Sequence, residues 1–182
     1  MRKGIIGLTV IALVAVAWAA AAPSPFRLLA KSTTSYKSKA NFLVTSPELR
    51  PNHHDNSFST DKKGKYHILL LAGPRADMMS FRVGQLTNPE IRVPAGTRLT
   101  LNIVNVDDDM VHDLYITSQP PPYGHVVHAT PIGSAILRPY KGTTYSAAAL
   151  VLLAAHAGTA YYVCTVPGHA QHGMWGKIVV TP

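Results

Sequence analysis

Three side chains near the carboxyl end of the chain carry donor atoms that bind soft metals. Cys164 is the only cysteine, His169 follows it five residues later, and Met174 follows after another five. A thiolate, an imidazole and a thioether are donors that copper prefers, and a second imidazole from elsewhere would complete a trigonal site with a weak axial sulfur. The spacing therefore predicts one mononuclear copper site and, with it, electron transfer.

The lone cysteine excludes several other kinds of site. One thiol cannot form an intramolecular disulfide, and it cannot supply the usual structural zinc sites, which take two or more cysteines. It also cannot hold a dinuclear copper centre bridged by a pair of cysteines. A buried structural cysteine is the alternative, because a free Cys packs as a small apolar residue. The neighbouring His169 and Met174 favour the metal site.

The residues around Cys164 predict a strand that runs into a tight loop. Residues 161–163 are aromatic or aliphatic, and residues 177–180 return to a strand-like pattern. Prolines and glycines break the chain between these two stretches, at Pro167, Gly168, Gly173 and Gly176. We therefore expect Cys164 to end a strand and the loop after it to fold back, so that the three donors converge.

The second imidazole must come from one of the other eight histidines. His112 lies between an acidic turn at 107–109 and the strand-like residues 113–117, and such a junction can hold a ligand rigidly and aim it inward. His125 and His128 lie in a proline-rich loop that fixes no direction for their side chains, and they remain open as ligands. The other five are expected in turns or in solvent: His53, His54, His67, His156 and His172.

Several motifs in residues 66–182 resemble those of the cupredoxins, and specifically of the rusticyanin group. They are Val-Pro-Ala-Gly-Thr at 93–97, a histidine before an apolar strand at 112, Pro-Pro-Tyr at 121–123, Gly-Thr-Ala-Tyr-Tyr-Val-Cys-Thr-Val-Pro-Gly-His at 158–169, the Cys-x4-His-x4-Met spacing, and Gly-Lys-Ile-Val-Val at 176–180. The resemblance implies an all-β fold, a Greek-key β-sandwich. It also implies one type 1 copper that alternates between Cu(I) and Cu(II).

The resemblance also implies the ligand set: His112, Cys164 and His169 in the plane and Met174 on the axis. The next residue departs from the family pattern, because many cupredoxins have Asn there and rusticyanin has Ser, whereas this chain has Asp113. A carboxylate that accepts hydrogen bonds from the Cys164 loop would favour Cu(II) and lower the reduction potential. The alternative is that Asp113 points to solvent and caps a turn.

In this family the second histidine passes the electrons, because the edge of its ring reaches the surface. That role falls to His169 here. The residues expected around it carry no charge: Pro120, Pro121, Pro122, Tyr123, Pro167, Gly168 and Ala170. An apolar surface of this kind suits brief, weak docking to a redox partner.

Length and composition divide the chain into three parts. At 182 residues there is room for one ordinary domain and an extension. Residues 66–182 are assigned to the cupredoxin domain. Residues 27–65 are rich in Ser, Thr, Lys and Asn, and this polar, basic linker is expected either as a tether or as loosely docked strands.

The formal charge of +8 is concentrated outside the cupredoxin domain. Residues 1–65 hold 10 Lys or Arg against 3 Asp or Glu, whereas residues 66–182 hold 7 against 6. The basic residues of the first part are spread out and are not interleaved with aromatic residues. Binding of nucleic acid is therefore not expected.

Residues 1–26 are predicted as a membrane anchor or signal segment. Arg2 and Lys3 precede 23 uncharged residues, 4–26, which suffice to span a membrane as a helix and exceed the usual core of a signal peptide. We expect an uncleaved helix that holds the copper domain on the periplasmic side of the inner membrane. Cleavage near the alanines at 19–22 would instead give a soluble periplasmic protein.

The chain is expected to carry electrons and not to act as an enzyme. Enzymes built on cupredoxin domains use a second copper site, whose histidines commonly flank the type 1 cysteine, whereas Val163 and Thr165 flank Cys164 here. The resemblance implies a c-type cytochrome or a cytochrome c oxidase as redox partner. A protein that delivers copper or helps to assemble an oxidase is the alternative from a different class.

Overall fold

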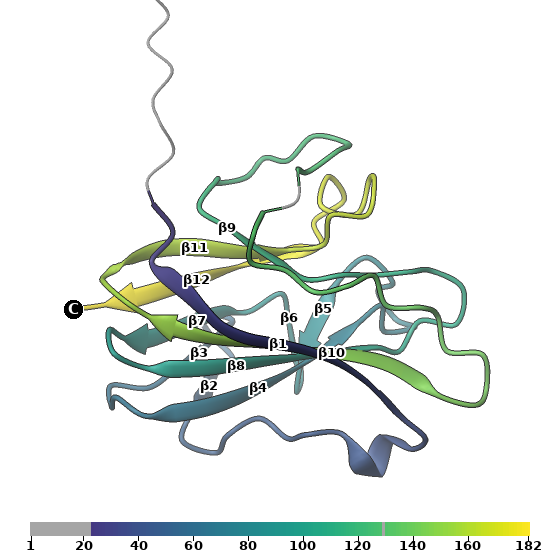
Figure 1. Cartoon of the computed structure of the whole chain (residues 1–182), viewed down its shortest axis with the longest axis horizontal. Helices are drawn as coiled ribbons and strands as arrows, with labels where there is room; N and C mark the ends of the chain where they lie inside the picture. The colour runs from purple at the N-terminus through teal and green to yellow at the C-terminus, as the bar shows by residue number, and fades with distance from the viewer. Residues whose placement is uncertain (1–22, 129) are drawn as a thin grey trace, which may run out of the picture.

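Two six-stranded β-sheets pack face to face in the computed structural model, which describes residues 23–128 and 130–182 (Figure 1). The first sheet contains, in spatial order, β1 (Phe26–Tyr36), β10 (Tyr145–Ala154), β8 (Arg98–Asn105), β4 (Lys65–Ala72), β5 (Phe81–Val83) and β6 (Leu86–Thr87). The second contains β2 (Arg50–Asn52), β3 (Ser57–Ser59), β7 (Glu90–Pro94), β12 (Trp175–Thr181), β11 (Gly158–Val163) and β9 (Tyr115–Thr117). A short 3-10 helix, η1 (Lys39–Asn41), follows β1. The predicted all-β sandwich is confirmed.

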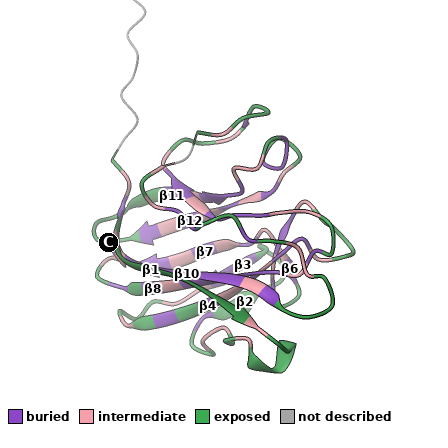
Figure 2. Cartoon of the chain, turned by 45° about the vertical axis from the view of Figure 1, so that its right-hand side comes forward, coloured by how far each residue is buried: buried purple, intermediate pink, exposed green. Residues whose placement is uncertain are grey.

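The strands alternate buried and exposed side chains, as expected for sheets with one face on a core. Strands β4, β10 and β12 follow this period of two closely, and Figure 2 marks the buried residues in purple along the strands of both sheets. One continuous apolar core includes Ile68, Leu101, Leu150, Tyr162 and Ile178, and it also contains Cys164 and Met174. The thiol and the thioether therefore sit at the end of the packed interior.

The polar linker of residues 27–65 contributes strands to both sheets. Strand β1 pairs antiparallel with β10 from Phe26 to Tyr36, and β2 and β3 pair with each other next to β7. The sandwich therefore includes strands that precede residue 66. The predicted anchor or signal segment falls almost wholly on residues 1–22, which lie outside the described part of the chain. In the described residues, none of the helices has the length and apolar character needed to cross a membrane.

One glycine explains how β11 and β12 fit together beside the predicted copper loop. Tyr162 of β11 is fully buried, and its hydroxyl donates a hydrogen bond to the Pro89 carbonyl at 2.7 Å. Gly176 is its partner on β12, and a Cβ at that position would collide with the Tyr162 ring. Because Gly176 has no side chain, the Tyr162 ring can lie across β12 at this position, two residues after Met174.

An ion-pair cluster joins β7 to β12. The Glu90 carboxylate lies 3.1 Å from Lys177 Nζ and also pairs with Arg92. Partial burial acts to raise the pKa of Glu90, but the hydrogen bonds and charges of Arg92 and Lys177 outweigh it and lower the pKa below its ordinary value. A lowered folded-state pKa means that the carboxylate stabilises the fold above its unfolded pKa, and that this stabilisation is lost as the pH falls through the folded pKa.

Replacement of this carboxylate is expected to have a small, pH-dependent effect. Glu90→Gln should lower the free energy of unfolding by about 0.5–1 kcal/mol at pH 7, because the pairs are partly exposed to solvent. The difference from wild type should shrink as the pH falls below about 4.3, the ordinary pKa of a glutamate, and should be lost once the folded carboxylate is protonated at a still lower pH. Urea unfolding at several pH values would measure it, with the exposed Glu48→Gln as control. A difference independent of pH would contradict the role of the charge.

Candidate metal centre

Three donor atoms from two distant parts of the chain converge at one end of the sandwich. Cys164 Sγ lies 3.5 Å from His169 Nδ1 and 4.0 Å from His112 Nδ1. In a trigonal plane with metal–nitrogen and metal–sulfur distances of about 2.0 and 2.3 Å, as in zinc sites, a sulfur and a nitrogen would lie about 3.7 Å apart. The observed spacing therefore fits a single ion held between the three side chains.

Backbone hydrogen bonds hold the Cys164 loop closed. The Cys164 N–H donates to the Met174 carbonyl at 3.1 Å, and the Met174 N–H donates to the His169 carbonyl at 3.0 Å. Gly168 and Gly173 adopt φ values of +85° and +100°, which permit the tight turns between these bonds. As predicted, Cys164 directly follows a strand, and the loop returns Met174, which is fully buried, next to the thiol.

His112 is fixed by a backbone bridge between the loop that follows β8 and the loop that follows β9. Its N–H donates to the Leu137 carbonyl at 3.2 Å, and its own carbonyl accepts from the Leu137 N–H at 2.7 Å. This bridge, outside both sheets, places the imidazole against the Cys164 loop. All the other histidines except His169 are exposed, including His125 and His128, and none of them belongs to the donor group.

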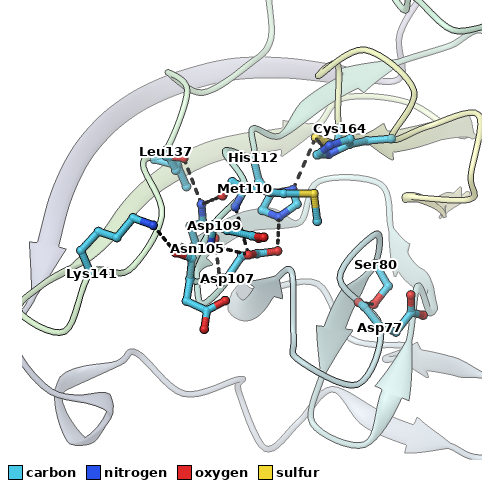
Figure 3. Close-up of polar contacts among 12 residues, drawn as sticks. Asp77, Ser80, Asn105, Asp107, Asp109, Met110, His112, Leu137, Lys141 and Cys164 are labelled. Carbon is cyan, nitrogen blue, oxygen red and sulfur yellow. Dashed lines mark hydrogen bonds and ion pairs between the residues drawn. The ribbon is translucent and has the colours of Figure 1, made fainter.

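A buried carboxylate holds the far side of the His112 ring. Asp107 Oδ2 lies 3.2 Å from His112 Nε2, and the two side chains are 1% and 0% exposed (Figure 3). The other oxygen, Oδ1, accepts the N–H groups of Asp109 and Met110 at 2.9 and 3.0 Å. A carboxylate bonded to Nε2–H leaves Nδ1 free to bind a metal and fixes the plane of the ring.

The protonation states suit a metal site. Burial lowers the pKa of His112, although the hydrogen bond that the ring donates to Asp107 acts to raise it, and burial also lowers the pKa of His169. Both imidazoles are therefore neutral at pH 7, as metal ligands must be. Burial raises the pKa of the Cys164 thiol to about 12, so that the metal-free thiol keeps its proton and releases it when a metal binds.

Gly73 leaves room for the Asp107–His112 pair. Its φ is +68°, and a Cβ there would lie 2.5 Å from His112 Nε2 and 2.6 Å from Asp107 Cβ. Both the backbone conformation and the space therefore require glycine. Neither Gly73 nor Asp107 was predicted as a site residue, because nothing in the sequence distinguishes Asp107 from Asp108 and Asp109 or places Gly73 near His112.

Asp113 is buried beside the thiolate loop, with 2% exposure. Its Oδ1 accepts the Thr165 N–H and its Oδ2 accepts the Thr165 hydroxyl, each at 2.6 Å. The alternative in which Asp113 points to solvent is therefore wrong. The carboxylate instead ties the residue after His112 to the residue after Cys164, next to the metal ligands.

Removal of this charge is expected to raise the reduction potential. The negative charge of Asp113 favours Cu(II) over Cu(I). Asp113→Asn removes this charge but keeps an oxygen that can accept the Thr165 N–H. We expect an increase of the order of 60 mV, which corresponds to about a tenfold change in the preference for Cu(I). Voltammetry of the copper-loaded protein would measure it, with the exposed Asp61→Asn as control. Equal potentials for wild type and Asp113→Asn at every pH would rule out the effect.

Comparison with known proteins places this site in a family. The sequence profile of the sulfocyanin (SoxE) domain matches residues 57–182. The chain belongs to the sulfocyanin (SoxE) domain family. The family match begins at β3, ahead of the domain start at residue 66 that composition indicated.

Rusticyanins are among the relatives of this sulfocyanin domain. The chain is 36% identical over 117 residues to rusticyanin of Acidithiobacillus ferrooxidans and 35% identical to that of Acidithiobacillus ferridurans, in each case over 63% of this chain and 62% of the relative. It therefore spans about three fifths of the length of these two relatives.

Solved structures agree in fold. Rusticyanin from Thiobacillus ferrooxidans superposes with a TM-score of 0.69 at 25% identity, over 82% of this chain and 97% of that one. Serine-to-aspartate and methionine-to-leucine variants of rusticyanin give 0.64 at 30% identity, over 73% and 86%. The protein is a rusticyanin-like cupredoxin.

The donor set of this sulfocyanin domain is that of a type 1 copper site. His112, Cys164, His169 and Met174 are arranged as such a site requires, and cupredoxins of this kind bind one copper. Copper bound by two imidazoles, a thiolate and a thioether would pass single electrons by alternating between Cu(I) and Cu(II). The residues around it supply rigidity: hydrogen bonds fix His112 through Asp107 and Leu137, and close the loop from Cys164 to Met174.

Proposed function

We propose that this protein shuttles single electrons between a c-type cytochrome and a terminal cytochrome c oxidase, on the periplasmic side of the inner membrane. The observation that carries the proposal is the buried donor group, in which only one ligand has any exposure. His112, Cys164 and Met174 are 0% exposed, whereas His169 is 5% exposed. An electron can therefore pass through the edge of one ring while the rest of the site stays out of water.

The surroundings of His169 support transient docking. Tyr123, Val163 and Ala170 form a small apolar cluster, with Trp175 packed against it. Exposed prolines at 120, 122 and 167 lie in the same two loops. Exposed prolines around a buried apolar cluster suit a partner that must bind briefly and leave after one electron has moved.

The proposed anchor would lie directly next to the copper domain. Strand β1 begins at Phe26 and pairs with β10 immediately, so that the segment predicted to enter the membrane, residues 1–26, would run directly into the folded sandwich. We propose an uncleaved anchor, which would keep the copper domain near membrane-bound partners and raise its effective concentration there.

The experiment that tests the exchange of electrons uses repeated redox cycles. The copper-loaded protein should be reduced by a ferrous c-type cytochrome and reoxidised by a cytochrome c oxidase many times, with its copper content unchanged. Transfer of the copper to a metal-free acceptor protein would contradict the proposal and favour copper delivery. Membrane fractionation of the full chain would test the anchor separately, because a cleaved protein would appear in the soluble fraction.

A further inference from the structure

An open groove of about 580 Å³ lies on the side of Asp107 that faces away from the thiol. Segments that are distant in sequence form it: η1 and the residues after it, the ends of β4 and β8, β5, and the start of β10. Three aromatic rings line it, and they pack closely. Tyr140 stacks on Tyr145 with 4.0 Å between ring centroids, and Phe42 meets Tyr145 edge-on at 5.1 Å. These contacts among the three rings make the aromatic wall of the groove rigid.

Basic side chains without acidic partners surround these rings. Lys39, Arg75 and Arg82 line the groove, and none of them forms an ion pair within the described part of the chain. Arg82 Nε is buried and has no hydrogen-bond acceptor. Lys141 lies close by, where its Nζ donates to the Asp108 carbonyl at 2.6 Å.

Two acidic residues also line the groove, but one of them is already satisfied. Asp107 uses one oxygen for two backbone N–H groups and the other for His112. Its partners carry no charge, so Asp107 and Asp108 set two negative charges against the three positive charges of Lys39, Arg75 and Arg82. The groove lining therefore keeps one net positive charge.

The groove wall is connected to the metal ligands by a short path. Asp107 Oδ2 is 3.2 Å from His112 Nε2, and His112 Nδ1 is 4.0 Å from Cys164 Sγ (Figure 3). One hydrogen bond thus joins a residue of the groove wall to His112, which is itself a member of the donor group. The rate of electron transfer falls steeply with distance, so that a partner seated in the groove would be well placed.

We propose that this groove is a second docking surface, which binds the acidic surface of a redox protein and admits an electron through Asp107 and His112. Arginine and lysine side chains without partners are complementary to carboxylates. One electron leaves the partner and converts Cu(II) to Cu(I), with no atom or proton transferred. The proposal rests on the proposed electron-transfer function and adds to it, since the His169 surface stays free and both partners can be bound together.

The anion site can be tested without copper. Hexacyanochromate(III), an inert paramagnetic trianion, should selectively broaden the amide signals of Gly73, Arg75 and Arg82 in ¹H–¹⁵N spectra of the metal-free protein. The double variant Lys39→Glu, Arg75→Glu should remove this broadening, and both side chains are exposed, so that folding is preserved.

The matched control carries the same change of charge elsewhere. Lys62→Glu, Lys63→Glu alters exposed residues near the opposite end of β8, where Lys63 lies against Gly96. It should leave the broadening at the groove unchanged. Broadening that is absent from the groove, or that both double variants weaken equally, would overturn the proposal.

Electron entry requires a second measurement on the copper-loaded protein. At low salt, ferrocyanide should reduce the groove variant about tenfold more slowly than the control variant, and the difference should vanish at high salt. Reduction by the cationic tris(phenanthroline)cobalt(II) should not be slowed in the groove variant. Equal rates of reduction by ferrocyanide in the two variants would mean that the groove binds small anions only, and would refute its role in electron entry. Failure to bind copper would refute the proposed function but not the anion site, which the metal-free spectra test alone.

Discussion

Replacement of Cys164 with alanine is expected to abolish the intense thiolate-to-copper absorption and the type 1 EPR signal. Cys164 is the only cysteine, and its Sγ lies 4.0 Å from His112 Nδ1 and 3.5 Å from His169 Nδ1. No other side chain of the chain can supply a thiolate. The remaining imidazoles and thioether would bind Cu(II) weakly, without the strong covalent sulfur bond on which the absorption depends.

The sandwich itself should survive this change. Loss of one buried sulfur atom leaves a small cavity and costs about 1 kcal/mol, well below the usual stability of a domain. Absorption, EPR and thermal unfolding would be measured with and without Cu(II). Copper should raise the melting temperature of wild type, because it binds only the folded state, and should have little effect on Cys164→Ala.

The control for Cys164→Ala is a neighbour that offers no donor atom. Val163→Ala also removes buried side-chain volume next to the site and should retain both the absorption and the EPR signal. A charge-transfer band that persists in Cys164→Ala would refute the assignment of the thiolate. A band lost equally in Val163→Ala would mean that packing, and not the sulfur donor, explains the result.

Gly73→Ala is expected to damage both the fold and the copper site. The φ of +68° disfavours any residue with a Cβ, and the added methyl would lie 2.5 Å from His112 Nε2. Either the strand end moves or the Asp107–His112 pair separates. We expect a loss of about 2–4 kcal/mol of stability, from backbone strain and crowding together. Loss of the carboxylate that orients His112 should weaken copper binding about 10- to 100-fold.

Gly142→Ala separates the two causes. Gly142 has a φ of +84°, but a Cβ there would meet no atom within 4 Å. This variant should therefore lose only about 1–2 kcal/mol from the left-handed backbone conformation and keep its copper affinity. Chemical unfolding would compare the stabilities of Gly73→Ala and Gly142→Ala, and competitive copper titration would compare their copper affinities. Indistinguishable stabilities and affinities would show that the close approach of Gly73 to His112 has no energetic consequence.

The parts of the site that sequence could predict are those within one loop. Cys164, His169 and Met174 lie five positions apart in the sequence, and glycines and prolines mark the turns between them. His112 required a choice among histidines, and the resemblance to cupredoxins made it. Asp107 and Gly73 could not be predicted, because their roles depend on two strand ends that the first sheet brings together.

Strand β1 illustrates a second limit. Its eleven residues are almost all exposed or half-buried, since it lies at the edge of the first sheet and only Phe26 is buried. Its composition is therefore that of a polar tether, and no apolar period marks it as a strand. What fixes it is the backbone pairing with β10, which composition does not reveal.

If the proposed anchor is retained, the same strand sets the height of the copper site above the membrane. Pro25 lies against Gly158, at the start of β11, whereas Cys164 follows the other end of that strand. Six residues of extended chain span about 20 Å. With an anchor ahead of Pro25, the bilayer would lie beneath one end of the sandwich. The His169 surface and the groove beside Asp107 would both lie at the opposite end, facing the aqueous space. Soluble carriers could then reach either surface without displacing the protein from the lipid.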